Sequence, residues 1–202
     1  MINLEDNIKK IVVVASNNYH KIKEIKEILT EYTIVALKDI GFSDEIEETG
    51  TTFKENALIK ANAIHTYLKK SGKEYLVLAD DSGLCVDSLD GAPGVYSARY
   101  AGIHGNEQAN RDKLLKELEG KDRTAHFNCT IAIIYPNGDS RIFEGKTFGR
   151  ITTEERGKKD FGYDCLFYSN DLKKTFGEAT EKEKNSVSHR ARALERIKKE
   201  LL

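Results

Sequence analysis

Short β-branched runs alternate with segments of helical periodicity in the first half of the chain. Residues 11–15, 32–37 and 75–79 are apolar enough to be buried or partly buried strands. Residues 19–29 and 53–70 lie between them and repeat apolar positions at the spacing of one helix face. Strands that alternate with helices build α/β folds. We therefore expect an α/β fold.

The second half of the chain departs from this alternation. Residues 125–135 and 140–149 predict two strands joined by a hairpin turn at 136–138, Pro-Asn-Gly. Residues 106–119 and 187–202 predict two further helices. Because a hairpin follows the alternating part, we expect one mixed sheet with flanking helices.

Length and charge limit the class of protein. The chain of 202 residues contains no repeat and no Pro- or Ser-rich linker, so we expect a single domain with residues 1–10 as an N-terminal extension. A formal net charge of −1 provides no basic field for nucleic acid, and no apolar run approaches the ~20 residues that cross a bilayer. We expect a cytoplasmic protein that binds neither nucleic acid nor membrane. Cys85, Cys129 and Cys165 form no CxxC pair, which favours buried free thiols over a zinc site.

Two adjacent carboxylates, Asp80 and Asp81, follow the apolar run at 75–79. Open α/β sheets build their sites at such strand ends, and paired carboxylates are costly unless a cation or hydrogen bonds relieve them. Neighbouring side chains on a strand point to opposite faces, so one aspartate could hold Mg²⁺ while the other activates water. An ordinary acidic turn is the alternative. Glu47 and Glu48 could complete a metal site, but a solvated acidic loop also explains them.

Three segments could bind an anion or a flat base. Residues 16–21, Ser-Asn-Asn-Tyr-His-Lys, lie where a strand leads into a helix, which suits phosphate, although a capped surface helix would look the same. Residues 161–164, Phe-Gly-Tyr-Asp, could stack a base and bond its edge, although core aromatics are an equal explanation. Lys184, His189 and Arg190 form a basic cluster suited to phosphate or a carbonyl oxygen, or simply a charged helix start.

Six short motifs occur in a fixed order, at residues 16–21, 47–56, 79–83, 91–99, 161–164 and 188–190. This set resembles the inosine/xanthosine triphosphate pyrophosphatase family, in its bacterial branch. The resemblance implies an elongated α/β fold of two lobes around a long mixed sheet, with the active site in the groove between the lobes, and a homodimer. It also implies Mg²⁺ and the hydrolysis of deaminated purine triphosphates (ITP, dITP and XTP) to the monophosphate and pyrophosphate.

The same resemblance implies roles for individual residues. Asp81 would be the proton acceptor and a metal ligand, Asp80 beside it would be a metal ligand too, and Glu47 or Glu48 would supply a further one. The residues that would bind substrate are Ser16, Asn17, Asn18, Tyr19, His20, Lys21, Lys60, Ser82, Phe161, Gly162, Tyr163, Asp164, Lys184, His189 and Arg190. The alternative function is a nucleotide-binding sensor without catalysis, which would not need both aspartates.

Overall fold

A six-stranded mixed sheet runs through the molecule in the order β2-β1-β3-β4-β5-β6. The computed structural model describes residues 11–201, so the expected extension at 1–10 lies outside the described residues. The strands are β1 (Ile11–Val14), β2 (Thr33–Ala36), β3 (Leu76–Val86), β4 (Thr124–Ile134), β5 (Ser140–Ile151) and β6 (Phe167–Ser169). β1 pairs in parallel with β2 and β3, whereas β3 to β6 pair antiparallel. The expected α/β class with a mixed sheet is confirmed.

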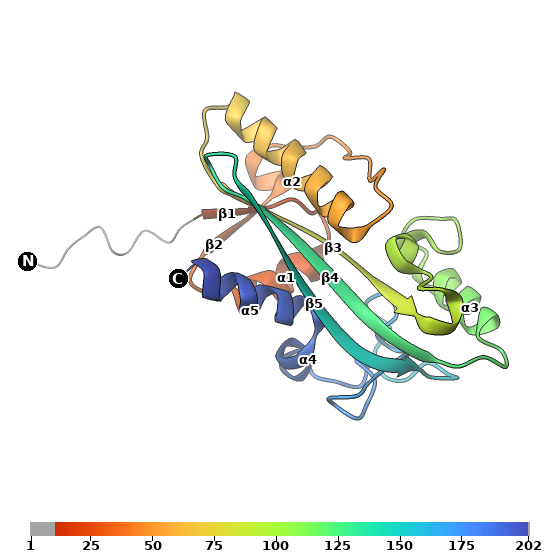
Figure 1. Cartoon of the computed structure of the whole chain (residues 1–202). Helices are drawn as coiled ribbons and strands as arrows, with labels where there is room; N and C mark the ends of the chain where they lie inside the picture. Colours follow the sequence, from red (N-terminus) through yellow and green to blue (C-terminus); the bar gives the residue numbers. More distant parts are fainter. Residues whose placement is uncertain (1–10, 202) are drawn as a thin grey trace, which may run out of the picture.

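Five α-helices flank the described sheet, with α2 on one face and α1 and α5 on the other (Figure 1). They are α1 (Tyr19–Ile28), α2 (Phe53–Lys70), α3 (Glu107–Glu117), α4 (Glu181–Val187) and α5 (His189–Leu201), with short 3-10 helices η2 (Leu37–Ile40), η3 (Asp87–Leu89) and η4 (Gly94–Arg99). Side-chain caps set their starts: Asn18 accepts from the backbone of Lys21, and Thr52 forms a capping box with Glu55.

The C-terminal helix predicted over 187–202 is confirmed as α5, but the short helix α4 directly before it was not predicted. Two helices, α4 and α5, meet at Ser188, whose backbone is extended. The Ser188 hydroxyl accepts a hydrogen bond from the backbone N–H of Ala191, at 3.1 Å, and so caps α5. Lys184 therefore lies on α4, while His189 and Arg190 begin α5.

The prediction that the third strand ends before Asp80 is also wrong, and so is the alternative of an acidic turn. β3 continues to Val86 because β4 gives it an unbroken antiparallel partner, with Asp80 opposite Ile131 and Asp81 opposite Thr130. Gly83 then lets η4 lie against the strand, since a Cβ at this position would come within 2.3 Å of the Gly94 carbonyl oxygen. The two aspartates thus occupy the middle of a long strand.

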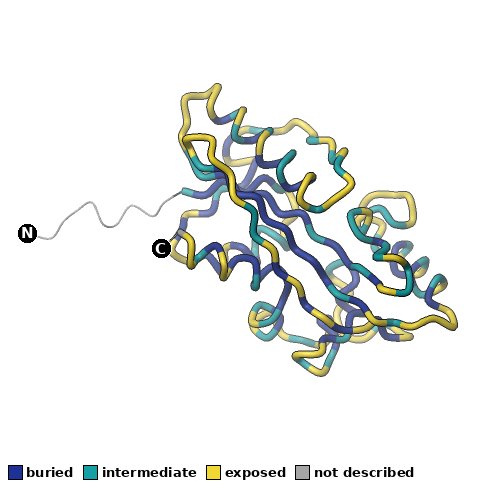
Figure 2. Tube along the Cα trace, viewed as in Figure 1, coloured by how far each residue is buried: buried dark blue, intermediate teal, exposed yellow. Residues whose placement is uncertain are grey.

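Alternate side chains of the strands pack into cores on opposite faces. Val12 and Val14 join Ile25 of α1 in one core, whereas Val13 joins Ile64 of α2 in the other. A third core, around Leu84, Phe127 and Phe167, fills the far end of the sheet. The buried stretches of the chain follow the strands through all three cores, as Figure 2 shows.

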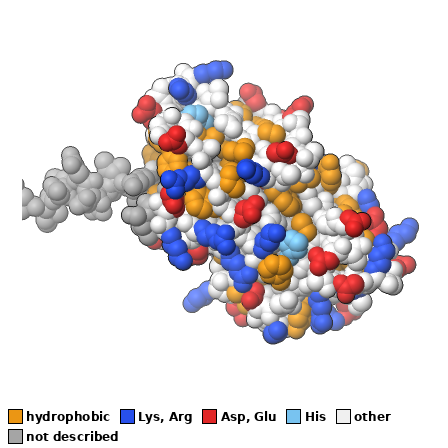
Figure 3. Space-filling model, viewed as in Figure 1, with side chains coloured by type: hydrophobic (Ala, Val, Ile, Leu, Met, Phe, Trp, Pro, Cys, Tyr) orange, Lys and Arg blue, Asp and Glu red, His pale blue; other side chains and the backbone are white. Residues whose placement is uncertain are grey.

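The surface is mixed in charge. Figure 3 shows acidic and basic side chains interspersed over one face. Within residues 11–201 no helix is both long and apolar enough to span a bilayer. The three cysteines are free thiols, with Cys129 and Cys165 buried as expected and Cys85 partly exposed.

Candidate active site

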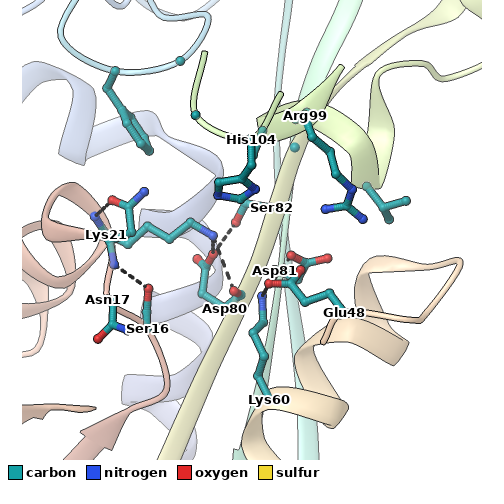
Figure 4. A pocket seen from close by; sticks show the side chains of 18 of the residues that line it. Ser16, Asn17, Lys21, Glu48, Lys60, Asp80, Asp81, Ser82, Arg99 and His104 are labelled. Atoms are coloured by element: carbon teal, nitrogen blue, oxygen red, sulfur yellow. Dashed lines mark hydrogen bonds and ion pairs between the residues drawn. The ribbon is translucent and has the colours of Figure 1, made fainter. Parts of the chain in front are cut away.

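A pocket of about 440 Å³ lies beside the middle of β3 (Figure 4). Asp80 and Asp81 both line it, together with Ser82 and Gly83. The other walls come from the β1–α1 junction, the loop at 44–48, α2, η4 with the loop after it, the loop at 161–164, and the start of α5. The chain therefore brings segments from both its halves to one pocket.

Asp80 is completely surrounded by partners. Its Oδ1 accepts from Lys21 Nζ at 2.6 Å and from Ser82 Oγ at 2.7 Å. Its Oδ2 accepts from Arg190 Nε at 2.8 Å and from Cys129 Sγ at 3.1 Å. Burial alone would raise the pKa of Asp80, but Arg190 and Lys21 hold it well below its usual range. Asp80 is consequently an ionised carboxylate, and both of its oxygens already accept hydrogen bonds from protein side chains.

Asp80 is one member of a buried ion network that continues away from β3. Glu24 of α1 binds both Arg190 and Lys184, the latter with its Oε1 2.9 Å from the ammonium. Lys184 also lies 2.6 Å from Asp164 Oδ2. Three cations thus balance three carboxylates, in the order Lys21, Asp80, Arg190, Glu24, Lys184 and Asp164.

Asp81 faces the opposite side and has different partners. Its Oδ1 accepts from Lys60 Nζ at 3.1 Å, and the same ammonium lies 3.1 Å from Glu48 Oε1. Burial raises the pKa of Asp81, with Glu48 adding to the rise and Lys60 opposing it. Its other oxygen, Oδ2, is buried and has no hydrogen-bond partner in the described part of the chain. The two aspartates thus have separate sets of partners, while the expected division of tasks between them stays a prediction.

Glu48 and Asp81 are the carboxylates that could hold a metal ion. Residues 11–201 contain no group of three or more His, Cys, Asp or Glu side chains placed to do so. Mg²⁺, however, commonly takes one or two protein carboxylates and fills its shell with water and substrate phosphates. The unpaired Asp81 oxygen, together with the Glu48 carboxylate that shares Lys60 with Asp81, fits that donor set. Glu47 is exposed and does not line the pocket, so the geometry favours Glu48 of the two glutamates.

The loop at 161–164 and the start of α5 form a more aromatic part of the pocket. Phe161 stacks on His20 with ring centroids 5.0 Å apart, and His189 stacks on Phe127 at 4.8 Å. Burial, and then Arg190, hold the pKa of His189 well below its usual range, so this imidazole is neutral. Its Nδ1 is buried and unpaired within the described residues. Tyr163 has a different task, because its hydroxyl donates to the Ser97 carbonyl oxygen at 2.9 Å.

Several expected substrate-binding residues do not reach this pocket. Tyr19 is 70% exposed, and His20 and Lys184 line a smaller adjoining pocket on the other side of Phe161 and Asp164. Arg190 does line the main pocket, but it is 1% exposed and already binds Asp80 and Glu24. Both ends of its guanidinium are therefore bound within the ion network, and direct contact of Arg190 with phosphate or with the base stays a prediction. The remaining expected residues, Ser16, Asn17, Asn18, Lys21, Lys60, Ser82, Phe161, Gly162, Tyr163, Asp164 and His189, line it.

Sequence reasoning missed Glu24, Arg99 and His104. Arg99 and His104 line the pocket from the loop region after β3, and Arg99 ends the motif at 91–99 that the resemblance used without giving it a role. Glu24 sits on α1 among charged residues of ordinary helical spacing, and no sequence signal marks it as buried. Its position becomes meaningful only when α5 packs beside α1.

Comparison with known proteins places this fold and pocket in a family. The model of the Ham1 family matches residues 12–200. A dITP/XTP pyrophosphatase of Clostridium perfringens is 49% identical over 198 residues, covering 95% of this chain and 97% of that protein. Another, from Bacillus subtilis, is 47% identical and covers 95% and 97%. The solved Staphylococcus aureus Ham1 protein superposes with a TM-score of 0.84 at 39% identity, covering 95% of this chain and 98% of that one. The chain belongs to the Ham1 family.

Proposed function

We propose that this chain hydrolyses dITP, XTP and ITP to the monophosphate and pyrophosphate, and so removes deaminated purine nucleotides. The observation that carries the proposal is Asp81, a buried carboxylate with a free oxygen in a pocket beside Glu48 and Lys60. Relatives nearly half identical over 95% of the chain carry the name dITP/XTP pyrophosphatase. A sensor without catalysis would have no use for this second aspartate.

The proposed reaction is attack of water on the α-phosphorus. A bond forms between the water oxygen and the α-phosphorus, the bond from that phosphorus to the α–β bridging oxygen breaks, and pyrophosphate leaves. Asp81 accepts the proton of the attacking water, a role that suits a carboxylate whose pKa is raised by burial. Mg²⁺, when held by Asp81 and Glu48, would neutralise charge on the triphosphate.

The remaining pocket residues would position the nucleotide. Ser16, Asn17 and Asn18 lie at the start of α1 and would bind phosphate oxygens, while Lys21 beside them stays paired with Asp80. The ring of Phe161 offers a surface on which a purine can stack.

We propose that base selection comes from His189. Its neutral imidazole has an unpaired Nδ1, which can donate to a 6-oxo group in one of its two tautomers. Adenine carries an amino group there and would leave that donor unsatisfied, which penalises ATP more than a merely lost contact would.

We extend the proposal to the organisation of the protein. The pocket is the groove between two lobes of one domain spanning 1–202, since its walls come from segments on both sides of β3. The enzyme acts as a homodimer, as the family resemblance implies, and it acts in the cytoplasm, as expected above from the lack of a long apolar run. Size-exclusion chromatography with light scattering tests the dimer, and a monomer at micromolar concentration contradicts it.

The decisive experiment measures pyrophosphate release from dITP, XTP, ITP, GTP and ATP, each with Mg²⁺ and with EDTA. We expect fast, metal-dependent release from the first three and a monophosphate as the other product. Asp81→Asn serves as the matched inactive control. Orthophosphate as product, equal rates on all five, or tight binding without turnover would instead indicate a general phosphatase or a sensor.

A further inference from the structure

Four Lys or Arg side chains line the main pocket, and three of them are committed to carboxylates. Lys21 binds Asp80, and Lys60 binds both Glu48 and Asp81. The third, an arginine at the start of α5, is held by Asp80 and Glu24 as described above. The fourth, Arg99, has no ion pair and no side-chain hydrogen bond to any described residue. It is therefore the pocket cation whose charge is still available.

Among the residues that the structure describes, the side-chain contact of the Arg99 guanidinium is an aromatic one. Its Cζ lies over the Tyr96 ring at 5.2 Å from the centroid, and the Tyr96 side chain is itself largely exposed. A guanidinium stacked in this way keeps its edge N–H donors free for two oxygens of one anion.

The backbone that carries Arg99 is fixed to the sheet. The Ser97 hydroxyl accepts from the backbone N–H of Leu84 in β3 at 2.9 Å and donates to the Gly94 carbonyl oxygen at 2.7 Å. The Tyr163 hydroxyl binds the Ser97 carbonyl oxygen from the opposite wall. The arginine thus projects from a support that is tied to both β3 and the loop at 161–164.

The direction of Arg99 shows which part of a nucleotide it meets. Figure 4 shows its side chain pointing toward Asp81 and Glu48, across the pocket from Lys21. Phe161 stacks on His20, next to Lys21 in sequence, and so marks the other side of the pocket. An anion between Arg99 and the two carboxylates would belong to the phosphate end of the substrate.

We propose that Arg99 binds the β and γ phosphates of the triphosphate and holds them as the leaving pyrophosphate. This inference rests on the proposed function, because it assigns a role within the same site. The Arg99 guanidinium faces Asp81 and Glu48 across the pocket. Pyrophosphate and its bound cation would therefore lie between the arginine on one side and the two carboxylates on the other. Arg99 does not contact the base or the α-phosphate.

The test is equilibrium binding of inorganic pyrophosphate and, separately, of inosine monophosphate, by calorimetry with Mg²⁺ present. Arg99→Gln should raise the Kd for pyrophosphate on the order of 10- to 100-fold, the loss expected for charge-assisted hydrogen bonds. Arg99→Lys keeps the positive charge but loses the paired N–H donors of the guanidinium. Its Kd for pyrophosphate should therefore lie between those of the wild type and Arg99→Gln. The Kd of Arg99→Gln for inosine monophosphate should stay within about 2-fold of the wild-type value. Losing one charge-assisted hydrogen bond would change it by much more than that.

Arg150 provides a matched control. Its Cζ also lies over a tyrosine ring, that of Tyr168 at 4.7 Å, and it too has no ion pair to a described residue. Unlike the half-buried Arg99, it is exposed and lies outside the pocket. Arg150→Gln should leave both Kd values unchanged. Unchanged pyrophosphate binding in Arg99→Gln, or an equal loss of inosine monophosphate binding, overturns the inference.

Failure of the two proposals can be told apart. If the wild type binds pyrophosphate but hydrolyses no triphosphate, the proposed function fails and the Arg99 comparison is still decided by binding. If the wild type turns over ITP while Arg99→Gln binds pyrophosphate normally, the function stands and the Arg99 assignment is wrong. A wild type that binds no pyrophosphate also overturns the assignment.

Discussion

Replacing Glu24 by glutamine should test the buried ion network directly. Burial would raise the pKa of Glu24, but Arg190 and Lys184 together lower it from 4.5 to about 2. Each pKa unit corresponds to about 1.36 kcal/mol, so the ionised carboxylate contributes about 3 kcal/mol to the free energy of unfolding at neutral pH. That is a large part of the roughly 5–15 kcal/mol that holds a domain folded.

The pH dependence follows from the sign of that change. Because the pKa of Glu24 is lower in the folded state, its stabilisation is complete above about pH 4.5 and is lost as the pH falls toward 2. Glutamine has no such dependence. The difference in unfolding free energy between wild type and Glu24→Gln should therefore be about 3 kcal/mol at pH 7 and shrink steadily as the pH falls below about 4.5.

Urea denaturation followed by circular dichroism, at a series of pH values from 7 to 3, measures this difference. Glu27→Gln is the control on the same helix, because Glu27 is exposed and its nearest ammonium, that of Lys23, lies 3.9 Å away. Its effect should stay within about 0.5 kcal/mol. A Glu24→Gln cost below about 1 kcal/mol at pH 7, or one that does not change with pH, would refute the account of the network.

Three further predictions concern the pocket. Asp81→Asn should lower kcat for ITP by on the order of 100-fold or more without lowering Tm, and near-normal turnover would disprove its role as base. Phe161→Ala should raise KM for ITP on the order of 10-fold with a smaller change in kcat, as steady-state kinetics will show, because a stacking surface worth about 1–3 kcal/mol is lost. Gly83→Ala should destabilise the fold by roughly 1–3 kcal/mol in urea denaturation, since its Cβ would lie 2.3 Å from the Gly94 carbonyl oxygen; unchanged stability would show that η4 can move away.

The local signals in the sequence predicted most of the secondary structure. The helices at 19–29 and 53–70 and the hairpin at 136–138 follow from periodicity, caps and turn residues, which depend on neighbouring positions alone. The length of β3 does not follow from local signals. Asp80-Asp81-Ser82-Gly83 is a sequence typical of a turn, and it becomes part of a strand only because β4 pairs with it. The break at Ser188 likewise depends on a cap that only the folded helix reveals.

The candidate site divides in the same way. Asp81 could be named from its motif, Glu48 only as an alternative to Glu47, and Lys60 only from the family resemblance; the structure brings the three together. The ion pair between Arg190 and Glu24 could not be predicted from the sequence, because Glu24 lies 166 positions away on another helix. A sequence shows which charged groups are present but not which of them neutralise one another. Arg99 escaped notice for the same reason, since its significance is that the other pocket cations are paired.

The opposite directions of Asp80 and Asp81 have a practical consequence. Asp80 is built into the ion network, whereas Asp81, among residues 11–201, pairs only with Lys60 and keeps one oxygen unpaired, so removing the charge of Asp81 need not disturb the network around Asp80. Asp81→Asn should then be a folded protein that still encloses its triphosphate and does not cut it. Such a variant would serve as a substrate trap: recovered from a nucleotide extract, it would carry the molecules that the enzyme selects, and mass spectrometry could read them directly.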